Sequence, residues 1–137
     1  MTTRAAGKFD VTLAPQPLAD AEADASLGRR SIDKQFHGAL DATSCGEMLS
    51  AGTQTAGSAG YVAIEHVTGT LDGRRGTFVL QHTGTMTRGT PQLQCNVIPD
   101  SGTDELTGLS GSMQISNAGG AHSYEFDYSI DEHATGT

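Results

Sequence analysis

Apolar and polar residues alternate with period two along much of the chain, the pattern that half-buried β-strands produce. Near the beginning, Phe9, Val11 and Leu13 alternate with polar neighbours. The last such run places four apolar side chains on one face: Tyr124, Phe126, Tyr128 and Ile130. Runs of this kind predict strands near both ends of the chain.

The longest alternation covers residues 31–43, with Ile32, Phe36 and Leu40 on one face and Gly38 between them. We predict one long strand here, bent at Gly38, because a glycine inside a strand often marks a bend. The sequence then predicts a return strand beginning at residue 47, and further strands follow in the second half of the chain.

Residues 14–28 break the alternation with two prolines and a run of alanines and acids, so we predict a surface loop or lid there. The tail, residues 131–137, is predicted to be flexible. About eight strands with short links remain, which is typical of a sandwich or a closed barrel. We favour a single all-β domain over residues 1–137, with residues 7–130 forming an eight-stranded antiparallel barrel, because closure removes exposed strand edges.

One hairpin, residues 60–88, carries the most informative chemistry. Asp72-Gly73 is a strong turn signal between two runs rich in β-branched and aromatic residues. A four-residue loop would pair Glu65 with His82, and a two-residue loop would make them diagonal neighbours. Both alternatives put the carboxylate and the imidazole on the same side of the sheet.

Composition narrows the range of partners. The chain has 137 residues and a formal net charge of −8, a balance that repels nucleic acids and anionic membranes. No apolar run has the length of a membrane-spanning helix, and the first residues lack the apolar core of a signal peptide. We therefore expect a cytoplasmic protein with neither nucleic-acid nor membrane partners. Cys45 and Cys95 are expected to be free thiols, with a disulfide or a reactive thiol as alternatives.

A polar cluster is predicted if the face with Ile32 and Phe36 points into the barrel, because Lys34 then points inward as well. In that case Lys34 pairs with Glu65, and His82 hydrogen-bonds nearby. Glu65 and His82 are the candidate catalytic residues, exchanging protons with a ligand, while Lys34 orients an anionic group.

Two other interpretations of these residues stay open at this point. The same groups can form a satisfied buried network that fixes the strand register. Alternatively, the opposite face points inward and all three side chains are solvated. Arg29 and Arg30, at the predicted barrel mouth, are a weak signal for an anionic ligand.

The predicted ligand is a small apolar or anionic organic molecule held inside the barrel. Six residues are predicted to contact it: Lys34, Phe36, Tyr61, Phe78, Leu80 and Tyr128. No HExxH, GxSxG or GxGxxG motif is present, so we expect no metal and no cofactor, and hydrolase chemistry is disfavoured. Isomerase- or cyclase-type acid–base chemistry is the enzymatic alternative. A non-catalytic barrel with a filled core, acting through self-association or protein partners, is the other.

Several segments resemble an uncharacterised bacterial family, classed as a domain of unknown function. The resemblance lies in residues 33–38 (DKQFHG), 60–65 (GYVAIE) and 76–82 (GTFVLQH). Residues 99–111 are similar to a glycine-rich segment of allene-oxide-cyclase-like and dirigent-like barrels, with Asp104 in place of one glycine.

This resemblance implies an eight-stranded antiparallel barrel of the allene-oxide-cyclase-like type, with a central cavity. It also implies a homo-oligomer, of which a dimer is the favoured form. It implies no established activity, and cyclase chemistry follows only by analogy at the level of the fold.

Overall fold

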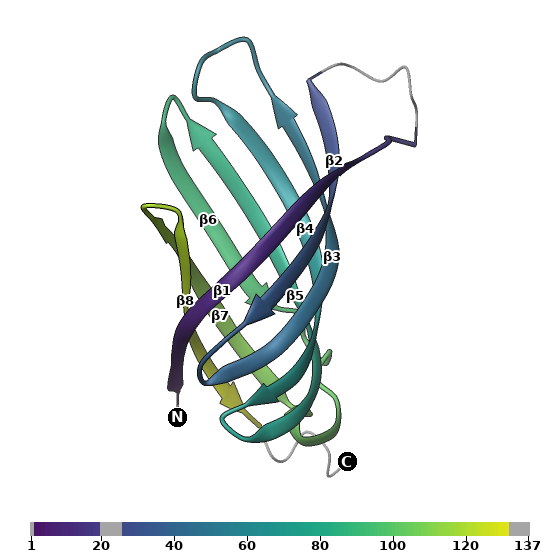
Figure 1. Ribbon diagram of the computed structural model, residues 1–137, viewed down its shortest axis with the longest axis vertical. Helices are drawn as coiled ribbons and strands as arrows, with labels where there is room; N and C mark the ends of the chain where they lie inside the picture. The colour runs from purple at the N-terminus through teal and green to yellow at the C-terminus, as the bar shows by residue number, and fades with distance from the viewer. Residues whose placement is uncertain (1, 20–25, 132–137) are drawn as a thin grey trace.

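The computed structural model of the protein describes residues 2–19 and 26–131 and contains eight strands joined in a closed barrel (Figure 1). The strands are β1 (Thr3–Gln16), β2 (Leu27–Phe36), β3 (Leu40–Gly52), β4 (Ala59–Leu71), β5 (Arg74–Thr87), β6 (Thr90–Val97), β7 (Leu109–Ala118) and β8 (Ala121–Ile130). Each strand pairs antiparallel with the next, and β8 pairs with β1. The predicted all-β, eight-stranded antiparallel barrel is therefore confirmed.

The two ends of the barrel are filled differently. At one end, called the closed end, lie the β2–β3 and β4–β5 turns and a short 3-10 helix, η1 (Asp104–Leu106) (Figure 1). Inward side chains pack there into a continuous apolar core, whose large members include Phe36, Leu40, Leu71, Phe78, Leu106 and Phe126. The opposite end, called the open end, carries the β3–β4, β5–β6 and β7–β8 connections (Figure 1).

The barrel wall is less continuous toward the open end. Strand β6 pairs with β7 only at Asn96↔Ser112, and β1 pairs with β8 only from Thr3 to Phe9. The β7–β8 hairpin is consequently held by β1 along most of β8, whereas β7 pairs with β6 only near the closed end. This difference in pairing leaves the open end less tightly enclosed than the closed end.

The long strand predicted over residues 31–43 is wrong, because the structure divides it into two strands. Strand β2 ends at Phe36, and β3 begins at Leu40. Gly38 lies in the intervening turn with φ 98°, a left-handed conformation that glycine adopts without steric penalty. Phe36 and Leu40 nevertheless both point into the barrel, as predicted, since both are completely buried.

The connection between the first two strands is shorter than the predicted loop over residues 14–28. Strand β1 continues to Gln16, β2 begins at Leu27, and Pro15 pairs with Arg30. Proline is tolerated there because this part of β1 pairs only with β2, so its missing N–H removes no ladder bond on the other side. The rest of the predicted lid includes residues 20–25, and the predicted tail includes 132–137; both segments lie outside the described residues.

No helix in residues 2–19 and 26–131 is long and apolar enough to cross a membrane. The predicted cytoplasmic location stays a prediction.

Candidate functional site

The β4–β5 hairpin fixes how the candidate acid and base meet. Leu71 pairs with Arg74, so the turn contains only Asp72 and Gly73, and Glu65 lies opposite Leu80. Both turn residues have positive φ, as a type I′ hairpin turn requires. The shorter of the two predicted loops is therefore the correct one. His82 is a diagonal neighbour of Glu65, and its Nε2 lies 2.8 Å from Glu65 Oε1.

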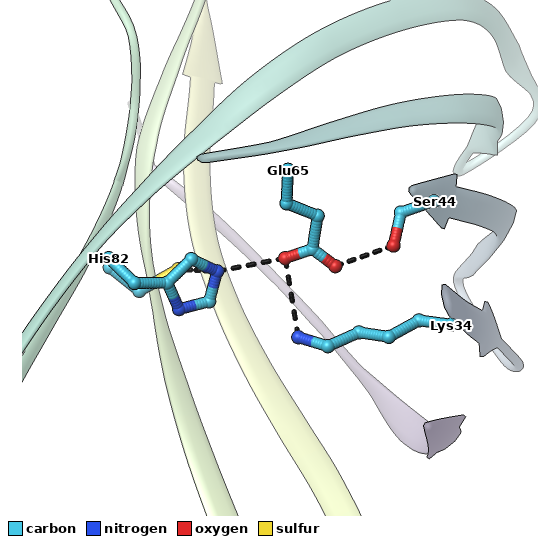
Figure 2. Close-up of polar contacts among 5 residues, drawn as sticks. Lys34, Ser44, Glu65 and His82 are labelled. Carbon is cyan, nitrogen blue, oxygen red and sulfur yellow. Dashed lines mark hydrogen bonds and ion pairs between the residues drawn. The ribbon is translucent and has the colours of Figure 1, made fainter. Parts of the chain in front are cut away.

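Glu65 is the centre of a buried polar cluster, defined here as Lys34, Ser44, Glu65, His82 and Cys95 (Figure 2). The glutamate is completely buried. Lys34 Nζ donates to its Oε1 at 3.2 Å, and Ser44 Oγ donates to its Oε2 at 2.5 Å. The ammonium group also lies 4.9 Å from the centre of the Phe9 ring, a favourable cation–π contact. Four strands, β2 to β5, are tied together through one carboxylate.

The surroundings of Glu65 keep it ionised. Burial alone raises the pKa of the carboxyl, because desolvation disfavours the charged form. The hydrogen bond from His82, the charge of Lys34 and the hydrogen bond from Ser44 outweigh that effect, and the pKa of Glu65 is lowered. The alternative in which these side chains face solvent is therefore wrong, since all of them point into the barrel.

His82 is the member of the cluster that retains an unused hydrogen-bonding atom. Since the ionised Glu65 only accepts, Nε2 carries a proton and donates it. Nδ1 has no hydrogen-bond partner among the described residues. Within those residues, every completely buried nitrogen or oxygen of a non-exposed side chain has a partner. Nδ1 must therefore reach open space inside the barrel, in agreement with the 5% exposure of the His82 side chain.

Cys95 lies beside this imidazole, with Sγ 3.6 Å from Nε2, yet it is a poor nucleophile. Burial, and then the charge of Glu65, raise the pKa of the thiol to about 12. It therefore stays protonated at neutral pH. Cys45 is exposed and free, so the two cysteines are the unpaired thiols we expected.

An open cavity of about 430 Å³ lies above the cluster on the inner wall of the open end. Its inward side chains come from β2 to β6: Arg30, Met48, Ser50, Tyr61, Met86 and Leu93. Gly84 and Leu93 line it and are the next inward residues after His82 on β5 and Cys95 on β6. The cavity and the polar cluster thus occupy adjacent levels of one lumen.

Tyr61 lies flat against the wall because its cross-strand partner is Gly84. A Cβ atom at position 84 would come within 2.3 Å of the Tyr61 ring, so only glycine leaves room for this placement. The flattened ring lines the cavity without filling it.

The predicted ligand-contacting residues divide between two regions of the barrel. Tyr61 lines the cavity and Lys34 belongs to the polar cluster. The other four do not line the cavity, because they are buried in the core of the barrel: Phe36, Phe78, Leu80 and Tyr128. Their assignment to a ligand is corrected here: large side chains on neighbouring strands fill the lumen by themselves.

Two tyrosines of this core hold turns of the closed end. Tyr124 donates its hydroxyl proton to the carbonyl of His37 at 2.7 Å and accepts from the Leu40 N–H at 3.0 Å. Tyr128 donates to the carboxylate of Asp72, and burial together with this bond raises the pKa of Tyr128 to about 12. Both hydroxyls therefore stabilise turns of the barrel.

Met48, Met86 and Leu93 line the cavity but were missed as site residues. Each occupies the inward phase of its strand, so the alternation contains the necessary signal. The alternation does not show how far along the barrel axis the packed core extends. Within the described residues, no three His, Cys, Asp or Glu side chains are grouped so as to hold a metal ion.

Comparison with known proteins now places the chain. Residues 5–128 match a family described as proteins of unknown function, DUF3224. The chain belongs to the DUF3224 family. A crystal structure of a DUF3224 protein of unknown function from Shewanella oneidensis MR-1 is similar, with 51% identity and a TM-score of 0.90. The match covers 96% of this chain and 98% of that one. No curated protein matches.

Membership confirms the resemblance to an uncharacterised family. The likeness of this DUF3224 protein to allene-oxide-cyclase-like barrels stays a prediction, as does its oligomeric state.

Proposed function

We propose that this DUF3224 protein binds a small, largely apolar organic molecule in the open end of its barrel. The observation that carries the proposal is the cavity of about 430 Å³ lying directly above the buried polar cluster, whose central carboxylate, Glu65, is completely buried. Ligand sites typically occupy about 300–1,000 Å³ and combine apolar walls with a few fixed polar groups. Met48, Met86 and Leu93 supply such walls, and His82 supplies a polar group beneath them.

In this proposal the two candidate catalytic residues have different roles. Glu65 has a lowered pKa and its oxygens are occupied by three donors, so it is a weak base that does not touch a ligand. It orients His82 and fixes its tautomer, as a carboxylate does in hydrolase triads. His82 Nδ1 is the atom that hydrogen-bonds to the ligand or exchanges a proton with it. Isomerisation or cyclisation by acid–base chemistry at His82 is the reaction type that such an arrangement would support.

Native mass spectrometry of protein purified from its own host tests the proposal. We expect a small molecule bound in stoichiometric amount, which is lost in His82→Gln. Tyr128→Phe is the matched control, because it removes a hydrogen bond of the closed end and leaves the cavity intact. A wild-type protein that keeps its bare mass in saturating host metabolite extract would contradict ligand binding.

Self-association is a second candidate, favoured by the outer surface of β2, β3 and β4. Four outward apolar side chains there are between 44% and 52% exposed: Leu27, Leu49, Val62 and Ile64. Leu49 and Val62 are direct cross-strand partners, so the patch is contiguous. Exposed apolar patches of this kind often mark protein interfaces, and a symmetric dimer would bury two copies against each other.

Light scattering across a range of protein concentrations tests this second candidate. We expect a dimer that dissociates in Val62→Glu, whereas Thr68→Glu, also on the outside of β4, leaves it intact. A monomer at all concentrations for the wild-type protein would exclude self-association.

A further inference from the structure

The cavity has a chemically distinctive rim, where Arg30 is the only charged residue lining it within the part of the chain that the structure describes. Arg30 is exposed and lies opposite Pro15 and Met48 on the adjacent strands. Among residues 2–19 and 26–131, no carboxylate lines the cavity. The chain has 16 acidic and eight basic residues, so a cation with no carboxylate partner among the described residues stands out.

Comparison with the adjacent residue sharpens this point. Arg29 faces outward, where it forms an ion pair with Glu47 and donates to the carbonyl of Pro17 at 2.9 Å. Arg30 makes no ion pair or hydrogen bond with a described residue. Its guanidinium group therefore keeps all five N–H donors available at the entrance of the lumen.

We infer that the ligand is an amphipathic carboxylate, with its headgroup on Arg30 and its apolar body against Met48, Met86 and Leu93. This inference rests on the proposed function, because it names the ligand class of the same cavity. A single guanidinium group matches one carboxylate in a bidentate pair, and the flexible methionine side chains adapt to an unbranched or ringed apolar body. The far end of the ligand then approaches His82 from above.

Isothermal titration calorimetry with decanoate and 1-decanol tests the inference, since these probes share a chain and differ in the headgroup. We expect decanoate to bind more tightly than 1-decanol. Arg30→Gln should weaken decanoate binding by roughly tenfold or more, the scale of a charged hydrogen bond, and leave 1-decanol binding unchanged. Arg29→Gln is the control, because it removes the adjacent arginine from the outer face.

The possible outcomes separate the two proposals. Decanoate and 1-decanol binding with equal affinity, or an Arg30→Gln protein that binds decanoate as the wild type does, would overturn the carboxylate assignment and leave ligand binding in place. Failure of both probes to bind, together with the absence of any ligand from the host, would overturn both proposals.

Discussion

The closed and open ends of the barrel share strands β2 to β6 and the same alternation, yet they differ in what fills the lumen. At the closed end, Phe36, Phe78 and Phe126 are essentially inaccessible to solvent. At the open end, the inward positions carry Arg30, a glycine at 84 and methionines, and a cavity remains.

The buried polar cluster lies between these two regions. It separates a core that stabilises the barrel from a part of the lumen that contains the cavity. The comparison teaches that side-chain size and strand pairing together decide which part of this β-barrel is filled and which part keeps a cavity.

The largest loss of stability is expected for a substitution in the core of the closed end. Phe78→Ala removes a ring that is stacked 5.8 Å from the ring of Phe126, and we expect a loss of about 3–5 kcal/mol in the free energy of unfolding. Met86→Ala at the open end should lose less than about 1 kcal/mol, because Met86 is 43% exposed. Urea denaturation measures both, and equal losses would mean that the two ends are packed alike.

The second largest loss of stability is expected for substitutions in the polar cluster. Glu65→Gln leaves the buried Lys34 ammonium without its counterion, and we expect a loss of about 3 kcal/mol in unfolding free energy. Adding Lys34→Met to this variant removes the unpaired charge and should recover much of the loss. A single variant as stable as the wild type would show that the pair contributes nothing to folding.

Low pH should remove part of the stability that the ionised Glu65 contributes. Because the pKa of Glu65 is lowered from 4.5, its stabilising effect is complete above pH 4.5 and is lost as the pH falls through the folded-state pKa. The difference in urea midpoint between wild type and Glu65→Gln should therefore shrink as the pH is lowered from 5 toward 2. A difference that is constant over this range would contradict the ionised state of Glu65.

Overpacking the cavity wall is expected to change stability less than the core and polar-cluster substitutions do. Gly84→Ala forces the Tyr61 ring away from the wall and into the cavity, at a cost of about 1 kcal/mol in stability. Decanoate affinity should fall, and adding Tyr61→Ala should restore it by emptying the space. Unchanged affinity in Gly84→Ala would place the ligand elsewhere.

Much of this architecture could be predicted from the sequence. The alternation of apolar residues identified eight strands, and Asp72-Gly73 placed the central turn, because both signals are local. The same period placed Glu65 and His82 on one side of the sheet, but it left open whether that side faces inward, which the burial of Lys34, Glu65 and His82 decides. The division of residues 31–43 at Gly38 was missed, because the same glycine is compatible with a bend and with a turn.

Only the tertiary structure decided which inward residues line the cavity. The sequence predicted Phe36, Phe78, Leu80 and Tyr128 as cavity residues, whereas barrel closure packs them into the core. Met48, Met86 and Leu93 face the cavity instead. The physical reason is that strand alternation determines the face of each residue, while its level in the lumen depends on register and on side chains from strands distant in sequence.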